Sequence, residues 1–136
     1  MDVALSPLLF FDPADANVRE RAVARRTERA RERARRLYCA RCRHPISDER
    51  ERVTVNGGHT HTCTNPYGIT YRIGCFRSAP GCAADGTPTL EHTWFSGYAW
   101  QVAYCRGCDT HLGWLFTGAD AFYGLIVDRL TAAGPS

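Results

Sequence analysis

Two Cys-x-x-Cys pairs, Cys39/Cys42 and Cys105/Cys108, constrain the fold of this chain more than any other feature. Each pair forms a tight turn whose two sulfurs can face one ion, and four thiolates complete the tetrahedral shell that zinc prefers. The 62 residues between the pairs are many more than a small zinc ribbon uses. The intervening chain must therefore form a sheet whose ends the metal ties together. We predict one structural zinc ion, because four cysteines leave no position for a catalytic water.

The other cysteine chemistry open to the chain is redox chemistry. A redox Cys-x-x-Cys pair opens a helix in a βαβ unit, and nothing here has that pattern. Three further cysteines, Cys63, Cys75 and Cys82, lack metal spacing. We interpret them as buried free thiols, with a Cys75–Cys82 disulfide as the alternative.

The N-terminal part of the chain differs in composition from the rest. Residues 17–36 contain nine arginines and three glutamates, whereas the remainder is mildly acidic. Asp12 fits a helix N-cap before Pro13, and no glycine or further proline occurs before Leu37, so we predict a helix up to Leu37. We expect three parts: an extension with an Arg-rich helix (1–37), a β-rich zinc-binding domain (38–131) and a tail (132–136).

The domain is expected to be mainly β, with antiparallel strands joined by turns. Residues 98–104 and 112–116 are predicted strands on either side of the second cysteine pair. Residues 77–91 are rich in Gly, Pro and Asp and are predicted to form a loop.

The three tryptophans of the chain lie within 21 positions around the second cysteine pair. By strand parity Trp100 shares a face with Tyr98, and Trp114 shares a face with Phe116. In a hairpin centred on Gly107, Trp100 would lie opposite Trp114 and Tyr98 opposite Phe116. Such a patch can hold a flat ligand by stacking. The alternative is that the indoles are ordinary core residues.

The residues of this region resemble a known family. The run from Glu91 to Trp100 (Glu-His-Thr-Trp-Phe-Ser-Gly-Tyr-Ala-Trp) continues through the second cysteine pair to His111-Leu-Gly-Trp-Leu-Phe116. It closely resembles the thalidomide-binding CULT domain of cereblon, in a single-domain form of bacterial type. The first cysteine pair and Asn65-Pro66-x-Gly68 fit the same pattern. The resemblance covers residues 38–131 and implies a β-tent, in which two antiparallel sheets meet at an angle and are joined by the four-cysteine zinc site.

The resemblance also implies a function: non-enzymatic binding of small cyclic imides. These include thalidomide-like glutarimides, uracil-like rings and C-terminal cyclic imides of peptides. The imide would be held by backbone groups at His92 and Trp94, beside a loop at Asn65 and Pro66, with Phe116 at the base of the cage. The ligand-binding residues expected are Asn65, Pro66, His92, Trp94, Tyr98, Trp100, Trp114 and Phe116.

The chain departs from full-length cereblon in ways that limit what can be carried over. Neither a Lon-like N-terminal domain nor an adaptor-binding helical region is present in the sequence, so a ubiquitin-ligase role is not carried over. Tyr67 stands where the full-length proteins often have histidine, so we expect the contacts at the pocket rim to differ.

Two other functions compete with imide binding. Methionine sulfoxide reductases of the B type are similar in fold and zinc site, and Cys63 in His61-Thr-Cys-Thr-Asn65 partly matches their reactive-cysteine motif. The Arg-rich helix could contact nucleic acid, but glutamates interrupt the run, so no nucleic-acid partner is expected. We expect no enzyme activity. Without a leader or an apolar run of about 20 residues, we expect a cytoplasmic protein and no membrane partner.

Overall fold

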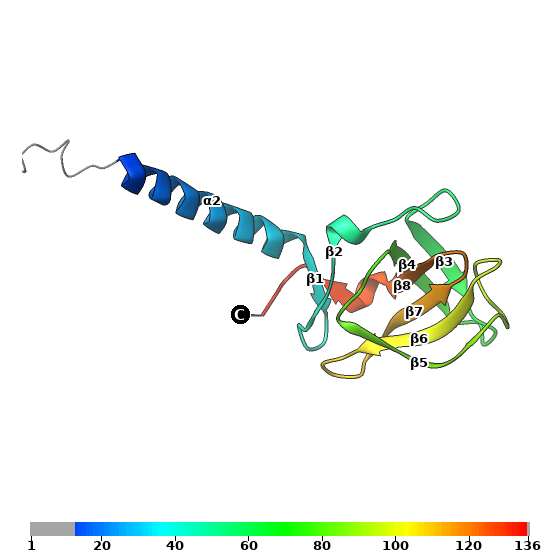
Figure 1. The fold of residues 1–136 in the computed structure, drawn as a ribbon. Coiled ribbons are helices and arrows are strands. Elements are labelled where there is room, and N and C mark those ends of the chain that lie inside the picture. The colour runs from blue at the N-terminus through cyan, green and yellow to red at the C-terminus, as the bar shows by residue number, and fades with distance from the viewer. Residues whose placement is uncertain (1–12, 136) are drawn as a thin grey trace, which may run out of the picture. The chain divides into compact units, whose positions relative to one another are not determined.

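The computed structural model describes residues 13–135, with side chains from Ala16 onward (Figure 1). The chain divides into two compact units, with the boundary between Ala34 and Arg35. Helix α2 (Pro13–Arg35) is built almost entirely from alanine, arginine and glutamate, which are strong helix formers. Its described side chains are largely exposed. The N-cap predicted at Asp12 lies outside the described residues.

The helix ends earlier than predicted. Arg36 and Leu37, which we expected to be helical, begin strand β1 (Arg36–Cys39). Leu37 is buried in a core that includes Cys39 and Ile46. Arginine and leucine are both good helix formers, but burial of Leu37 in this core and pairing of β1 with β2 stabilise the strand more than propensity stabilises the helix.

The remainder of the chain is mainly β, as predicted, and forms two antiparallel sheets. The small sheet has the order β2-β1-β9, and the large sheet has the order β3-β4-β8-β7-β6-β5. Two 3-10 turns, η2 (Glu49–Glu51) and η3 (Val127–Arg129), interrupt the strands. The strands besides β1 are β2 (Pro45–Asp48), β3 (Thr60–Thr64), β4 (Thr70–Phe76), β5 (Cys82–Thr89), β6 (Ala99–Cys105), β7 (His111–Thr117), β8 (Ala121–Ile126) and β9 (Leu130–Thr131).

Strand β5 corrects the loop predicted for 77–91. The segment contains Gly86 and Pro88, which argue against a central strand. In the structure β5 is an edge strand that pairs only with β6, and its pairing is irregular between Asp85 and Thr89. An edge position tolerates these residues because only one side of the strand needs hydrogen bonds.

The β6–β7 hairpin forms, but the register predicted for it is wrong. Trp100 pairs with Phe116, and Trp114 pairs with Val102. The hairpin closes through a four-residue turn, and a bulge adds one residue to β7. Together these features displace the pairing by two positions. Because the side-chain period of a strand is also two, the aromatic residues stay on the predicted faces.

Two clusters of buried residues form the core. One cluster packs between the sheets beside Cys39 and Cys105, and the other surrounds Phe95, Phe116 and Phe122. The three phenylalanines pack closely, with ring centroids 4.8 to 5.1 Å apart. Trp114 belongs to this second cluster, and Trp94 and Trp100 pack against it.

Candidate functional site

Four cysteine sulfurs gather where strands of the two sheets end. Cys39 ends β1 of the small sheet and Cys105 ends β6 of the large sheet. The ligand atoms of Cys39, Cys42, Cys105 and Cys108 all lie within 4.8 Å of one another. Two sulfur pairs are 3.5 and 3.7 Å apart. A tetrahedral ion with metal–sulfur bonds of about 2.3 Å requires sulfurs about 3.8 Å apart, so the cluster fits a metal ion.

The two cysteine turns have the same backbone geometry. In each, the residue after the second cysteine donates its N–H to the carbonyl of the first: Arg43 to Cys39 and Asp109 to Cys105, both at 2.8 Å. Arg43 and Asp109 both adopt left-handed conformations, with φ of 65° and 64°. This conformation is costly for residues other than glycine. Its occurrence in both turns indicates that the backbone is shaped to aim the sulfurs.

The local environment shifts the pKa values of two of these thiols in opposite directions. Burial raises the pKa of Cys105 to about 12. Hydrogen bonding to the hydroxyl of Thr110 lowers the pKa of Cys108 to about 6. Metal binding requires the thiolate form, which the lowered pKa of Cys108 favours.

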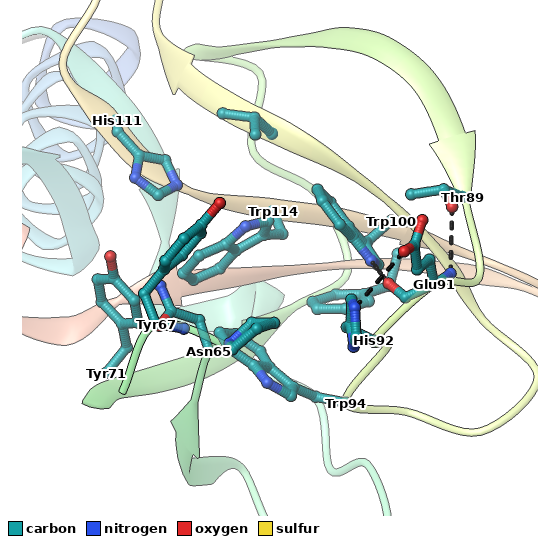
Figure 2. A pocket seen from close by; sticks show the side chains of 13 residues that line it. Asn65, Tyr67, Tyr71, Thr89, Glu91, His92, Trp94, Trp100, His111 and Trp114 are labelled. Atoms are coloured by element: carbon teal, nitrogen blue, oxygen red, sulfur yellow. Dashed lines mark hydrogen bonds and ion pairs between the residues drawn. The ribbon is translucent and has the colours of Figure 1, made fainter. Parts of the chain in front are cut away.

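An apolar cavity of about 500 Å³ lies at the predicted aromatic box (Figure 2). All three tryptophans line it. Trp94 and Trp114 meet edge to face, with ring centroids 4.7 Å apart. Phe116 closes the base and is 1% exposed, whereas Trp100 and Trp94 are half-buried. The tryptophans are thus partly core residues and partly walls of an open cavity.

Two indole N–H groups tie the loops at the cavity mouth. Trp100 donates its Nε1–H to the carbonyl of Glu91 at 2.7 Å. Trp94 donates its Nε1–H to the carbonyl of Thr64 at 3.0 Å. Because both polar edges are used by the protein, these two side chains have their apolar faces left for a ligand.

The loop that contains Asn65 and Pro66 is held by the Asn65 side chain. Its Oδ1 accepts hydrogen bonds from the N–H groups of Tyr67 (3.0 Å) and Ile69 (2.9 Å). Asn65 and Pro66 line the cavity, and Tyr67 stands at its rim, 90% exposed. The Asn65 side chain therefore shapes the loop through its oxygen.

The second loop presents backbone groups. His92 has a left-handed φ of 58°, which is strained for a side chain of this size. Within residues 13–135, neither the carbonyl of His92 nor the N–H of Trp94 takes part in a hydrogen bond. Both residues line the cavity. One acceptor and one donor thus remain unpaired at an apolar site.

Tyr98 is the exception among the residues predicted to bind ligand, because it does not line this cavity. Its ring packs on Phe122, with centroids 5.2 Å apart, and its hydroxyl donates to a carboxylate oxygen of Asp120. Tyr98 precedes β6, and its side chain supports the cage from outside.

Two aromatic residues that sequence reasoning missed line the cavity. Tyr71 and His111 meet Trp114 edge to face, with centroid distances of 5.1 and 4.8 Å. His111 Nε2 lies 3.0 Å from the carbonyl oxygen of Gly113, and burial lowers the pKa of this histidine. Strand alternation could have indicated Tyr71, but no sequence signal marked His111. The other lining residues missed were Thr89, Glu91 and Val102.

The three remaining cysteines are free, and none has the environment of a reactive thiol. Burial raises the pKa of Cys63, and it raises the pKa values of Cys75 and Cys82 to about 12. Cys75 and Cys82 belong to different core clusters, so the alternative disulfide is wrong. A reductase nucleophile needs an accessible thiolate, whereas Cys63 is half-buried and burial raises its pKa.

No helix among the described residues is long and apolar enough to cross a membrane.

Comparison with curated proteins finds similarity to cereblon. The chain is 43% identical to cereblon of Gallus gallus over 53 residues, which cover 39% of this chain and 12% of that protein. It is 32% identical to cereblon of Danio rerio over 83 residues, covering 60% and 19%. For Drosophila grimshawi the identity is 28% over 102 residues, covering 65% and 15%. The matches thus span less than one fifth of these relatives. No family model matches the chain.

Proposed function

We propose, from the premise that this chain is a cereblon-like CULT-domain protein, that its aromatic cavity binds small cyclic imides without catalysing a reaction. The observation that carries the proposal is the combination of apolar walls with two unpaired backbone groups, at His92 and Trp94. An apolar pocket with a few convergent polar groups is typical of a small-molecule site.

The chemistry of an imide matches this combination. One edge of the ring presents an acceptor, a donor and a second acceptor in a row. The His92 carbonyl can accept from the imide N–H, and the Trp94 N–H can donate to a carbonyl of the ring. The methylenes opposite this edge, polarised by the carbonyls, suit the faces of Trp94, Trp100 and Trp114. Glutarimides, uracil-like rings and peptides ending in a cyclic imide share this edge.

The four-cysteine site is proposed to hold one zinc ion with a structural role. Zinc is the common occupant of closed tetrahedral thiolate sites. The site ties β1 of the small sheet to β6, the strand that contains Trp100. Zinc would therefore hold the cage in place without contacting the ligand.

Isothermal titration of the zinc-loaded protein with glutarimide and N-methylglutarimide tests the proposal. Methylation removes the N–H and leaves a buried acceptor unpaired, which costs about 1–3 kcal/mol. We expect glutarimide to bind about 5- to 150-fold more tightly than its N-methyl analogue. Equal affinities, or no saturable heat with glutarimide in a folded, metal-replete sample, would refute imide recognition.

A further inference from the structure

Helix α2 separates its charges in a way that the linear sequence hides. Residues advance by about 100° per position in an α-helix, so Arg25, Arg26, Arg29 and Arg33 fall within one arc of about 100°. All four are exposed, and within residues 13–135 none of them forms an ion pair. We call these four residues the arginine stripe.

The acidic residues of the helix lie mostly away from this stripe. Glu20 and Glu28 point more than about 90° from its centre, and Glu32 lies at one edge. Glu28 instead approaches Arg31, on the opposite face, at 3.9 Å. The sequence-based expectation of no nucleic-acid partner relied on glutamates interrupting the run, and the helical geometry removes that objection for Glu20 and Glu28.

We propose that the arginine stripe binds the phosphate backbone of duplex nucleic acid, independently of base sequence. The guanidinium group matches phosphate geometry and stays charged at all relevant pH values. An α-helix fits the major groove of B-DNA, where phosphates of both strands flank it. Phosphate contacts carry no sequence information, so any preference for particular bases would be weak.

An anionic membrane is the competing polyanion, and the helix is poorly built for it. Helices that lie on membranes insert bulky residues such as Trp, Phe or Leu from a broad apolar face. The apolar positions of α2 are small, with Val23, Thr27, Ala30 and Ala34 on one side. Such a face gives little apolar area to insert, which favours nucleic acid.

The number of arginines sets the expected salt dependence. Neutralising four phosphates gives a slope of log affinity against log salt of about −3.6. Raising the salt from 50 to 200 mM should then weaken binding about 150-fold. The affinity should vary little among duplexes of different sequence.

Fluorescence anisotropy of a labelled 20-base-pair DNA duplex, titrated with the full metal-loaded chain, tests the proposal. The variant Arg26→Gln/Arg33→Gln removes half of the stripe. The matched control Arg31→Gln/Arg35→Gln makes the same charge change on the opposite side of the helix, and glutamine preserves helix propensity. We expect the slope to fall to about −1.8 in the stripe variant and to stay near −3.6 in the control.

Three results would overturn the proposal: equal losses in both variants, a slope shallower than about −1 in the unmodified protein, or tighter binding to phosphatidylserine vesicles than to the duplex. Circular dichroism checks that the variants keep equal helix content. If the double variant loses helix, the single variant Arg29→Gln should still change the slope by about 0.9. Glutarimide titration should be unaffected throughout, so this test is independent of the imide site.

Discussion

Replacing Trp100 separates two roles that the structure assigns to one side chain. Its indole forms a wall of the cavity, and its N–H holds the carbonyl of Glu91, next to His92. Trp100→Phe keeps an aromatic wall and removes the hydrogen bond. Trp100→Ala removes both. The difference in ligand affinity between the two variants therefore measures the contribution of the aromatic wall. The difference in affinity between Trp100→Phe and the unmodified protein measures the contribution of the hydrogen bond to Glu91, which we call the tether.

The expected magnitudes follow from these contacts. A hydrogen bond contributes about 0.5–1.5 kcal/mol net, so losing the tether should weaken glutarimide binding about 2- to 10-fold. Losing the wall removes an aromatic contact of about 0.5–1.5 kcal/mol. It also removes apolar burial of about 50 Å², worth about 1.3 kcal/mol. Together, Trp100→Ala should cost about 2–4 kcal/mol, or about 30- to 1,000-fold in affinity.

Isothermal titration of glutarimide into each variant is the assay, with thermal unfolding to confirm that the domain is folded. Trp94→Phe is a parallel test of the tether, because it removes the corresponding hydrogen bond to the carbonyl of Thr64 on the opposite loop. It should also weaken binding about 2- to 10-fold. Unchanged affinity in Trp100→Ala would refute the cage. An equal loss in Trp100→Phe and Trp100→Ala would refute the division between wall and tether.

Three further predictions concern stability. Gly113→Ala should lower the free energy of unfolding in urea by about 3 kcal/mol or more, because the new Cβ would lie 2.0 Å from the carbonyl oxygen of Gly124. The control Gly58→Ala should change the free energy of unfolding very little, because its Cβ meets only ordinary contacts. Equal effects of the two substitutions would contradict the packing argument. The Cys108→Ser variant should not retain the metal, and its melting temperature should fall sharply, because the free energy of binding structural zinc is about as large as the stability of a whole domain. The control Cys63→Ser should retain one metal ion per chain, as measured by elemental analysis. Burial lowers the pKa of His111 in the folded state, so the unfolded chain binds more protons as the pH falls below about 6.5, and acid should destabilise the unmodified protein more than His111→Gln. Parallel pH profiles of the melting temperature would show instead that folding does not change the pKa of His111.

Local chemistry accounts for what could be predicted. Cysteine spacing identified four residues whose sulfurs the structure brings together, because a Cys-x-x-Cys turn is a short-range feature. Alternation identified the strands that contain Trp100 and Trp114, since the side-chain period survives an error in register. Helix formers identified α2, although the predicted helix ran two residues too far, to Leu37.

Long-range pairing accounts for what could not be predicted. Strand β5 forms from a segment of loop-like composition because β6 supplies its hydrogen bonds. Leu37 leaves the helix because the small sheet buries it. His111 lines the cavity beside Trp114 because the bulge in β7, formed where it pairs with β6, changes the alternation of side chains between these two residues.

The sequence by itself determined the four clustered cysteines, the predominance of β structure and the three tryptophans that line the cavity, because each depends on residue type and short spacing. Only the tertiary structure decided the register of the β6–β7 hairpin, the exclusion of Tyr98 from the cavity and the inclusion of Tyr71 and His111. These features depend on how distant strands meet, and the hydrogen bonds that align them lie between backbones that the sequence does not distinguish.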